Sequence, residues 1–220
     1  LFHFDLYKEA RPGEVALVKG SITDNKGNPV NNAIVEVKDL KTRKTSLATI
    51  DSTSGTYMVA VKKGQDVVVT VKNDSLAFNS KVIRGTKLPA AVSEPVVVNL
   101  EVKPARIGDT FEIGDIQYNT NSAELFPESI VILEGFSEYL KKNKDLKVEI
   151  RGHTDNVGNP KENEALSTSR AFTVKTTLEV LGISAGRITA KGFGAALPVA
   201  SNSTEEGRAK NRRTEFRIIN

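Results

Sequence analysis

The sequence contains no cysteine, only two histidines, and no run of about eighteen apolar residues. The lack of cysteine excludes disulfide bonds and thiolate metal sites, but many periplasmic proteins also lack it, so the compartment stays open. Because no long apolar run is present, no segment is predicted to span a membrane. The chain opens on Leu1 and shows no signal peptide, so we expect a fragment whose targeting signal lies upstream.

The formal net charge of +4 raises the question of nucleic-acid binding. Residues 1–100 carry 14 basic and 10 acidic side chains, whereas residues 101–220 carry 17 of each. The basic excess is therefore confined to the first half and is thinly spread along it. Such a distribution does not make a stripe that follows a phosphate backbone, so no nucleic-acid partner is expected.

Residues 14–102 form short alternating apolar runs separated by Gly, Asn, Asp and Pro, which is typical of an all-β sandwich. The runs are VALVKGSITD, NAIVEVKDL, SLATIDS, SGTYMVAV, DVVVTVKND and VSEPVVVNL. Residues 1–13 also alternate, and they are interpreted as the remnant strand of an upstream domain or as a disordered chain end. His3 has no partner at ligand spacing and is expected at the surface.

A linker is predicted at residues 103–110, and a second domain at residues 111–220. Residues 113–118 are expected to form the first strand of that domain. Pro127 suits the first position of a helix, because proline lacks the N–H that would go unpaired there. The predicted core face of this helix contains Ile130, Leu133, Phe136 and Leu140.

The most informative stretch, residues 147–170, reads KVEIRGHTDNVGNPKENEALSTSR. Val148 and Ile150 alternate with charged residues and predict a strand, after which a polar loop begins. Beyond Pro160 the apolar spacing becomes helical until Gly182. Arg170 lies about two and a half turns into this helix, and long helical side chains point toward the N-terminus. The guanidinium of Arg170 is therefore expected to face Asp155, and the two charges together can hold a zwitterion.

The same two residues also fit a plainer interpretation, which spacing alone favours. Asp155 can be a turn or capping residue, and Arg170 can be a solvated helix residue. In that case Arg170 pairs with Glu164 or Glu179, and no ligand is involved.

Three further elements complete the second domain: strands at residues 187–193 and 213–219, and a short helix beginning near Thr204. Arg212 and Arg217 are expected to lie on an exposed strand face, where they pair with Glu149 and Glu215. That pairing would account for their charge without an anion ligand.

An enzyme was weighed as an alternative. His153 and Asp155 resemble two zinc ligands, but zinc hydrolases need a third protein ligand, and the only other histidine is His3. No serine is followed by lysine in a Ser-x-x-Lys motif, and no G-x-S-x-G motif occurs. We therefore expect no catalysis, no metal and no cofactor.

The motifs GHTDNVG, NEALSTSRA, LGISAGRI, KGFG and SNSTEEGRAKNRRTEFRI occur in that order. Together they resemble the OmpA-like C-terminal domain, a peptidoglycan-binding module, over residues 111–220. The resemblance implies an α+β fold with helices on one face of a small mixed sheet. It also implies that Asp155 binds the ammonium of diaminopimelate in the stem peptide and that Arg170 binds its carboxylate. The supporting contacts implied by the family are Thr154, Asn163, Arg213 and Asn121.

Residues 14–102 carry V-x-G-x-I-x-D, G-x-P, A-x-V-x-V and G-T-Y in order. This pattern resembles the carboxypeptidase-regulatory-like, or transthyretin-like, β-sandwich. The resemblance implies a spacer that contacts other envelope proteins and has no chemistry of its own. The domain order is similar to that of Bacteroidetes-type OmpA family envelope proteins, some of which serve a secretion machine.

The sequence thus predicts a periplasmic protein, associated with the outer membrane, that binds peptidoglycan without catalysis and anchors an assembly to the cell wall. Two alternatives remain. One is an envelope scaffold with a degenerate wall pocket, and the other is a stator-like motor component.

Overall fold

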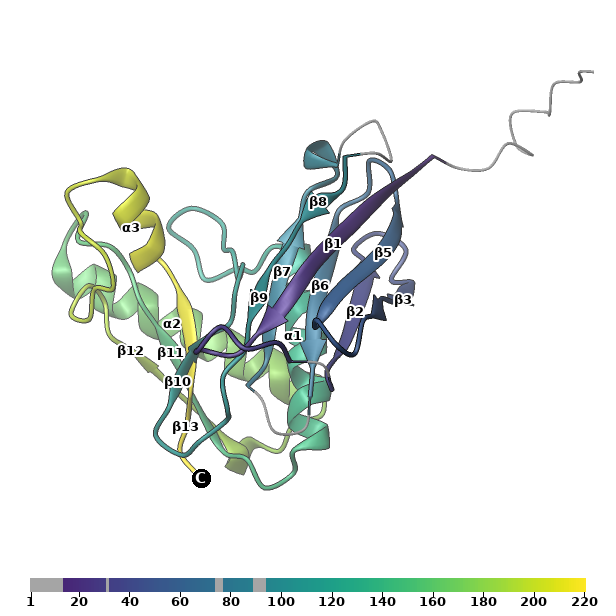
Figure 1. Cartoon of the computed structure of the whole chain (residues 1–220). Helices are drawn as coiled ribbons and strands as arrows, with labels where there is room; N and C mark the ends of the chain where they lie inside the picture. The colour runs from purple at the N-terminus through teal and green to yellow at the C-terminus, as the bar shows by residue number, and fades with distance from the viewer. Residues whose placement is uncertain (1–13, 31, 74–76, 89–93) are drawn as a thin grey trace, which may run out of the picture.

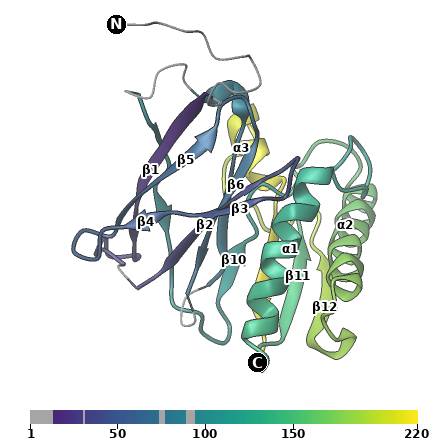
Figure 2. The ribbon, with the colours of Figure 1, turned by 90° about the vertical axis from the view of Figure 1, so that its right-hand side faces the viewer.

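The computed structural model describes residues 14–30, 32–73, 77–88 and 94–220. The predictions made for residues 1–13, His3 included, lie outside the described residues. The described chain consists of a β half followed by an α+β half, and the two halves lie side by side in both views (Figures 1 and 2).

The first sheet is organised around β1 (Val15–Thr23). This strand pairs antiparallel with β5 (Thr56–Lys62), which in turn pairs with the short β4 (Thr49–Ile50). On its other side β1 pairs in parallel with β8 (Val96–Val97) and β9 (Leu100–Glu101). Burial alternates along β1 and β5, so one face of the sheet points to the protein core.

The second sheet has the order β3-β2-β6-β7, and all its pairings are antiparallel. Its strands are β3 (Thr45–Leu47), β2 (Ile34–Asp39), β6 (Val67–Lys72) and β7 (Asn79–Ile83). The run SLATIDS, predicted as one strand, divides into β3 and β4, which belong to different sheets. Strand β7 was not predicted, because NSKVI has too few apolar residues to show an alternation.

The two sheets enclose one apolar cluster, so the β half is a two-sheet structure. Its most buried side chains include Val18, Ile22, Val35, Val69 and Val71. Burying each of these stabilises the fold by roughly 1.5–3 kcal/mol. Gly20 lets the chain pass closely, because a Cβ there would lie 1.8 Å from the carbonyl oxygen of Val98.

The sheet of the second half has the order β10-β13-β11-β12. Its strands are β10 (Thr110–Glu112), β11 (Val148–Gly152), β12 (Ile188–Gly192) and β13 (Thr214–Ile218). Only β11 and β12 run parallel, and the long helix between them makes the crossover that a parallel pair needs. The predicted small mixed sheet is confirmed.

Two helices, α1 (Pro127–Lys142) and α2 (Pro160–Val180), pack on one face of this sheet (Figure 2). Pro127 and Pro160 both occupy the first turn, as proline's fixed φ favours. A third helix, α3 (Glu205–Asn211), begins after Thr204, whose hydroxyl accepts a hydrogen bond from the N–H of Gly207. Short 3₁₀ turns occur at Gly85–Lys87 and Ala185–Arg187.

Two details of the second half differ from expectation. The first strand is residues 110–112 rather than 113–118, because the chain turns at Asp115, whose φ is +60°. The carboxylate of Asp115 accepts a hydrogen bond from the N–H of Val82, which holds this turn against β7. Ile130 was predicted in the core but is 36% exposed, since the buried face of α1 follows Leu133 and Phe136 instead.

The two halves share a continuous core through α1. Phe78, from the segment before β7, lies with its ring centroid 5.2 Å from that of Phe136. Basic side chains of the β half face acidic side chains of α1, and we call these contacts the interface pairs. They are Lys72–Glu138 at 2.6 Å, Arg84–Glu128 at 3.0 Å, Arg43–Glu134 at 3.2 Å, Lys38–Glu134 at 3.6 Å and Lys38–Glu138 at 3.8 Å.

The segment predicted as a linker, residues 103–110, makes contacts with both halves. The carbonyl of Lys103 accepts a hydrogen bond from the N–H of Ala77, and the N–H of Gly108 donates to the carbonyl of Ile218. Thr110 already belongs to β10. These bonds tie the segment to β-structure on both sides.

Candidate functional site

The polar loop that carries Asp155 leaves the sheet at the end of β11. Gly152 is the last strand residue, and a Cβ there would lie 2.2 Å from the carbonyl oxygen of Ser167, so α2 can pack directly on the strand end. Thr154 is buried, with its N–H bonded to the carbonyl of Gly194 and its hydroxyl bonded to the carbonyl of Asp155. Thr154 therefore shapes the loop from within.

Asp155 is only 8% exposed, and both its carboxylate oxygens accept hydrogen bonds. Oδ1 accepts from the N–H of Val157 at 3.0 Å, and Oδ2 accepts from Nη1 of Arg212 at 2.7 Å. Asn163 braces the same loop, because its Nδ2 donates to the carbonyl of Val157 at 2.9 Å. Asp155 thus closes a turn, as the plainer interpretation predicted, and also carries an ion pair that was not predicted.

Arg170 projects from α2 toward residues 118–122. Its Nε donates to the carbonyl of Ser122 at 2.9 Å, and its Cζ lies 4.8 Å from the centroid of the Tyr118 ring. Within the described ranges no carboxylate lies at ion-pair distance from it, so the pairing with Glu164 or Glu179 that the plainer interpretation gave does not occur. Glu179 pairs with Lys175 instead.

The electrostatic environment of Arg170 is unusual for a guanidinium. Burial lowers its pKa from the ordinary value, and the nearby charge of Arg212 adds to this, whereas Tyr118 and Asp155 oppose it. Tyr118 is itself buried, which raises its pKa to about 12, and its hydroxyl lies 2.9 Å from Oγ1 of Thr214. A charged group held in a partly dry place without an ionic partner is ready to receive an anion.

Arg213 was predicted as a supporting contact, but it is buried and bonded elsewhere. Its Nε donates to Glu215 at 2.7 Å, and its Nη2 donates to the carbonyl of Leu197 at 3.1 Å. Burial by itself raises the pKa of Glu215, but hydrogen bonds from His153 and Arg213 outweigh it and hold that pKa below its usual value. In this arrangement Arg213 joins β13 to the loop around Leu197.

Asn121 occupies the exposed loop before α1, with a left-handed φ of +52°. Its neighbour Ser122 provides the carbonyl that Arg170 contacts, so this loop lies against α2. The structure thus brings Asp155, Arg170 and the loop of Asn121 to one region of the second half.

Four contributors were missed from the sequence: Tyr118, Ser122, Glu205 and Arg212. Arg212 was predicted to pair with Glu149 or Glu215, but it pairs with Asp155 and Glu205. The reason is that Arg212 is the C-cap residue of α3, from which its side chain reaches back to Asp155. A weak signal for it existed, since the motif NRR ends the helix just before the last strand.

No cluster of three or more His, Cys, Asp or Glu side chains that suits a metal ion occurs among the described residues. His153 is stacked on Phe193 and bonded to Glu215 through Nε2 at 3.1 Å. Across the described ranges, no helix has both the length and the apolarity that crossing a bilayer requires.

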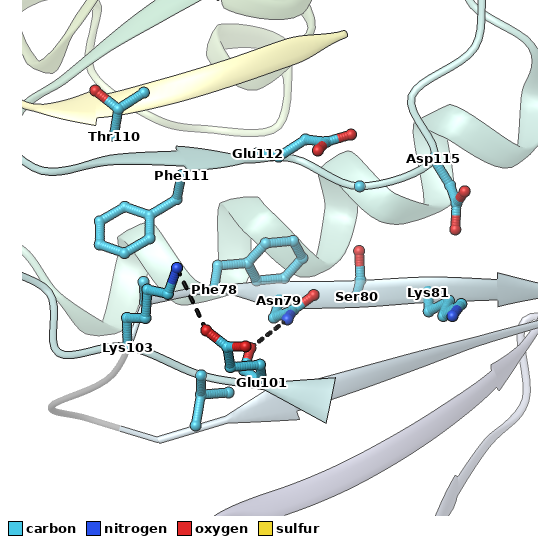
Figure 3. Close-up of a pocket in the computed structure, with 13 residues that line it drawn as sticks. Phe78, Asn79, Ser80, Lys81, Glu101, Lys103, Thr110, Phe111, Glu112 and Asp115 are labelled. Atoms are coloured by element: carbon cyan, nitrogen blue, oxygen red, sulfur yellow. Dashed lines mark hydrogen bonds and ion pairs between the residues drawn. The ribbon is translucent and has the colours of Figure 1, made fainter. Parts of the chain in front are cut away.

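Two hollows border residues of the second half. One of about 510 Å³ borders the Asp155 loop between Asn163 and Phe193. The other, of about 400 Å³, lies between β7 and β10 (Figure 3). There the buried hydroxyl of Ser80 points toward Glu112 and has no hydrogen-bond partner in the described part of the chain. Burial raises the pKa of Glu112, with Asp115 and Glu215 adding to the effect and Arg213 opposing it.

The fold and these contacts define an α+β domain of the OmpA-like type. The OmpA family pattern matches residues 117–212. Outer membrane protein A of Bordetella avium is 35% identical over 136 residues, which are 61% of this chain and 70% of that protein. The chain therefore belongs to the OmpA family.

Two further relatives were found. The peptidoglycan-binding protein ArfA of Mycobacterium tuberculosis is 41% identical over 107 residues, 49% of this chain. The chain spans only 32% of the length of that protein. The solved cell wall anchor of the T6SS from Pseudomonas aeruginosa is 34% identical, with a TM-score of 0.43, over 50% of this chain and 78% of that one.

Proposed function

We propose that residues 111–220 bind peptidoglycan without catalysis, through the free amino-acid centre of diaminopimelate in the stem peptide. The observation that carries the proposal is the half-buried guanidinium of Arg170, which lies in the same region as the buried carboxylate of Asp155. No carboxylate in the described part of the chain is at ion-pair distance from this guanidinium. A ligand carboxylate would supply the missing charge, and its ammonium would bind Asp155.

Relatives support a binding role. One is a peptidoglycan-binding protein by name, and another is an outer membrane protein. We therefore propose a periplasmic protein, associated with the outer membrane, that attaches an envelope assembly such as a secretion system to the cell wall. The finer assignments of Thr154, Asn163, Arg213 and Asn121 as ligand contacts belong to this proposal.

The proposal also covers the β half. It would be a carboxypeptidase-regulatory-like spacer at residues 14–102, joined by residues 103–110, that contacts other envelope proteins. Support comes from the outer face of the first sheet, where Met58 is 47% exposed and Val97 58% exposed.

The strength of such a site can be bounded. Charge-assisted hydrogen bonds contribute roughly 1.5–3 kcal/mol each. A few of them, less the entropy of association, give micromolar to millimolar affinity for a free stem peptide. Firm attachment then requires many copies or a second tether.

Calorimetry of the full chain with a diaminopimelate-containing muropeptide tests the proposal. Asp155→Ala and Arg170→Ala should each weaken binding by about tenfold or more. The matched control is Arg217→Ala, which removes an exposed charge that hydrogen-bonds to the carbonyl of Gly108.

A second ligand separates charge recognition from general adhesion. A muropeptide with lysine in place of diaminopimelate keeps the ammonium but lacks the terminal carboxylate. It should bind wild type about as weakly as diaminopimelate binds the Arg170→Ala variant. Equal binding of both muropeptides, or undiminished binding after Arg170→Ala, would count against the proposal.

A further inference from the structure

The ion pair on the Asp155 carboxylate involves Arg212, a residue to which no binding role has been given. Arg212 donates from Nη1 to Oδ2 of Asp155 at 2.7 Å and from Nη2 to Oε1 of Glu205 at 2.7 Å. It therefore bridges two carboxylates, one buried and one exposed. The Arg212 side chain is itself 40% exposed, so solvent reaches the bridge.

This contact occupies the atom that the ligand ammonium would need. Asp155 has one oxygen bonded to the N–H of Val157, which fixes the turn, so Oδ2 is the oxygen that faces a cation. Without Arg212, no cation of the described residues would lie at ion-pair distance from this buried carboxylate. An internal cation thus fills the acidic subsite in the unliganded protein.

We propose that Arg212 is a placeholder, a positioning residue that neutralises Asp155 when the site is empty and is displaced by the ligand ammonium. The inference rests on the proposed function. Glu205 completes the device, because the displaced guanidinium keeps one ion pair and does not lose all its partners. The positive charges of Arg170 and Arg212 are close enough to repel each other, as the lowering of the Arg170 pKa by Arg212 indicates. This repulsion also favours displacement of Arg212.

The proposal predicts whether the affinity for the ligand rises or falls when Arg212 is replaced. If Arg212 competes with the ligand, Arg212→Gln removes the competitor and binding becomes tighter, by about fivefold for a partly exposed pair worth about 1 kcal/mol. If Arg212 merely holds Asp155 in place or grips the ligand itself, the same substitution weakens binding.

The experiment is calorimetry of the full chain with the tripeptide L-Ala–D-Glu–meso-diaminopimelate. Arg208→Gln is the matched control, because Arg208 pairs with the same Glu205 at 2.8 Å and has no contact with Asp155. We expect tighter binding for Arg212→Gln, wild-type binding for Arg208→Gln, and restored competition in Arg212→Lys. Thermal melting of each variant confirms that the fold is retained.

A second measurement does not depend on a variant. In wild type, the side-chain ¹⁵N resonance of Arg212 should shift as tripeptide is added, whereas that of Arg208 should not. If wild type binds and Asp155→Ala does not, but Arg212→Gln binds equally or more weakly, the placeholder is overturned and the proposed function stands. If wild type shows no binding at all, both are overturned.

Discussion

Two regions of this molecule hold charged side chains in different ways. At the boundary of the halves, each interface pair joins a base of the β half to an acid of α1. Beside the Asp155 loop, Arg170 contacts a carbonyl and an aromatic ring, and no carboxylate of the described residues lies at ion-pair distance from it. The first region is internally complete and therefore structural. The second leaves a charge for something outside the chain.

The largest effect is expected where the two halves share their core. Phe136 is fully buried and contacts both Phe78 and Phe216, with ring centroids at 5.2 Å and 4.7 Å. Phe136→Ala should lower the free energy of unfolding by about 3–5 kcal/mol, measured by urea denaturation. The control Phe172→Ala, at a position that is 59% exposed, should stay within about 0.5 kcal/mol of wild type.

The comparison is sharpened at the binding region by Arg170→Met. Methionine is a similarly long, unbranched side chain, and it removes a desolvated charge that pairs with no carboxylate of the described ranges. We expect the free energy of unfolding to rise by up to about 1 kcal/mol while muropeptide binding is lost. A clear loss of stability would instead show that Arg170 is a structural residue.

The smallest effect is expected for one interface pair and is pH-dependent. Burial by itself raises the pKa of Glu138, but the hydrogen bond and charge of Lys72, with smaller help from Lys38 and Lys141, outweigh it and lower that pKa. Because the pKa of Glu138 is lower in the folded state, ionised Glu138 stabilises the fold at pH values above its unfolded pKa of about 4.3. This stabilisation is lost as the pH falls through the folded-state pKa. Glu138→Gln should therefore destabilise the protein at pH 7 by less than about 1 kcal/mol, and the two proteins should converge in acid.

Glu112, beside the crevice of Figure 3, provides the control of opposite sign. Its pKa is raised in the folded state, so its contribution to the free energy of unfolding is fully present below about pH 4.3. That contribution is lost as the pH rises through the folded-state pKa of Glu112. Glu112→Gln should therefore be slightly more stable than wild type at pH 7 and equal to it in acid. The difference in free energy of unfolding between each variant and wild type is measured by urea denaturation at several pH values. If this difference changes with pH in the same direction for both variants, the opposite pKa shifts of Glu138 and Glu112 are contradicted.

Much of the local structure could be predicted from the sequence. The apolar alternation of Val148 and Ile150 gave β11, and Pro127 and Pro160 marked the helix starts, because these signals act within a few residues. Strand β7 could not be found, since its residues are held by pairing with β6 and by Asp115. The division of SLATIDS between two sheets likewise depends on strands far away in the sequence.

The candidate site shows the same limit. Motif order identified Asp155 and Arg170, but their partners come from residues up to 57 positions away, such as Arg212. Arg213 and Arg212 look alike in sequence, yet one is buried against Glu215 and the other reaches Asp155. Both arginines stand just before β13, and adjacent side chains at the start of a strand point in opposite directions. Only the packing of α3 decides which of the two reaches Asp155.

The sequence by itself determined the two-part organisation, the helices and most strands, and the pair of charges on a strand–loop–helix unit. Tertiary structure alone decided that α1 joins the two halves and that Arg212 pairs with Asp155. It also decided that no carboxylate of the described residues pairs with Arg170. The physical reason is range: hydrogen bonding and apolar periodicity are written locally along the chain. Desolvation and ion pairing depend on which distant side chains the fold brings together.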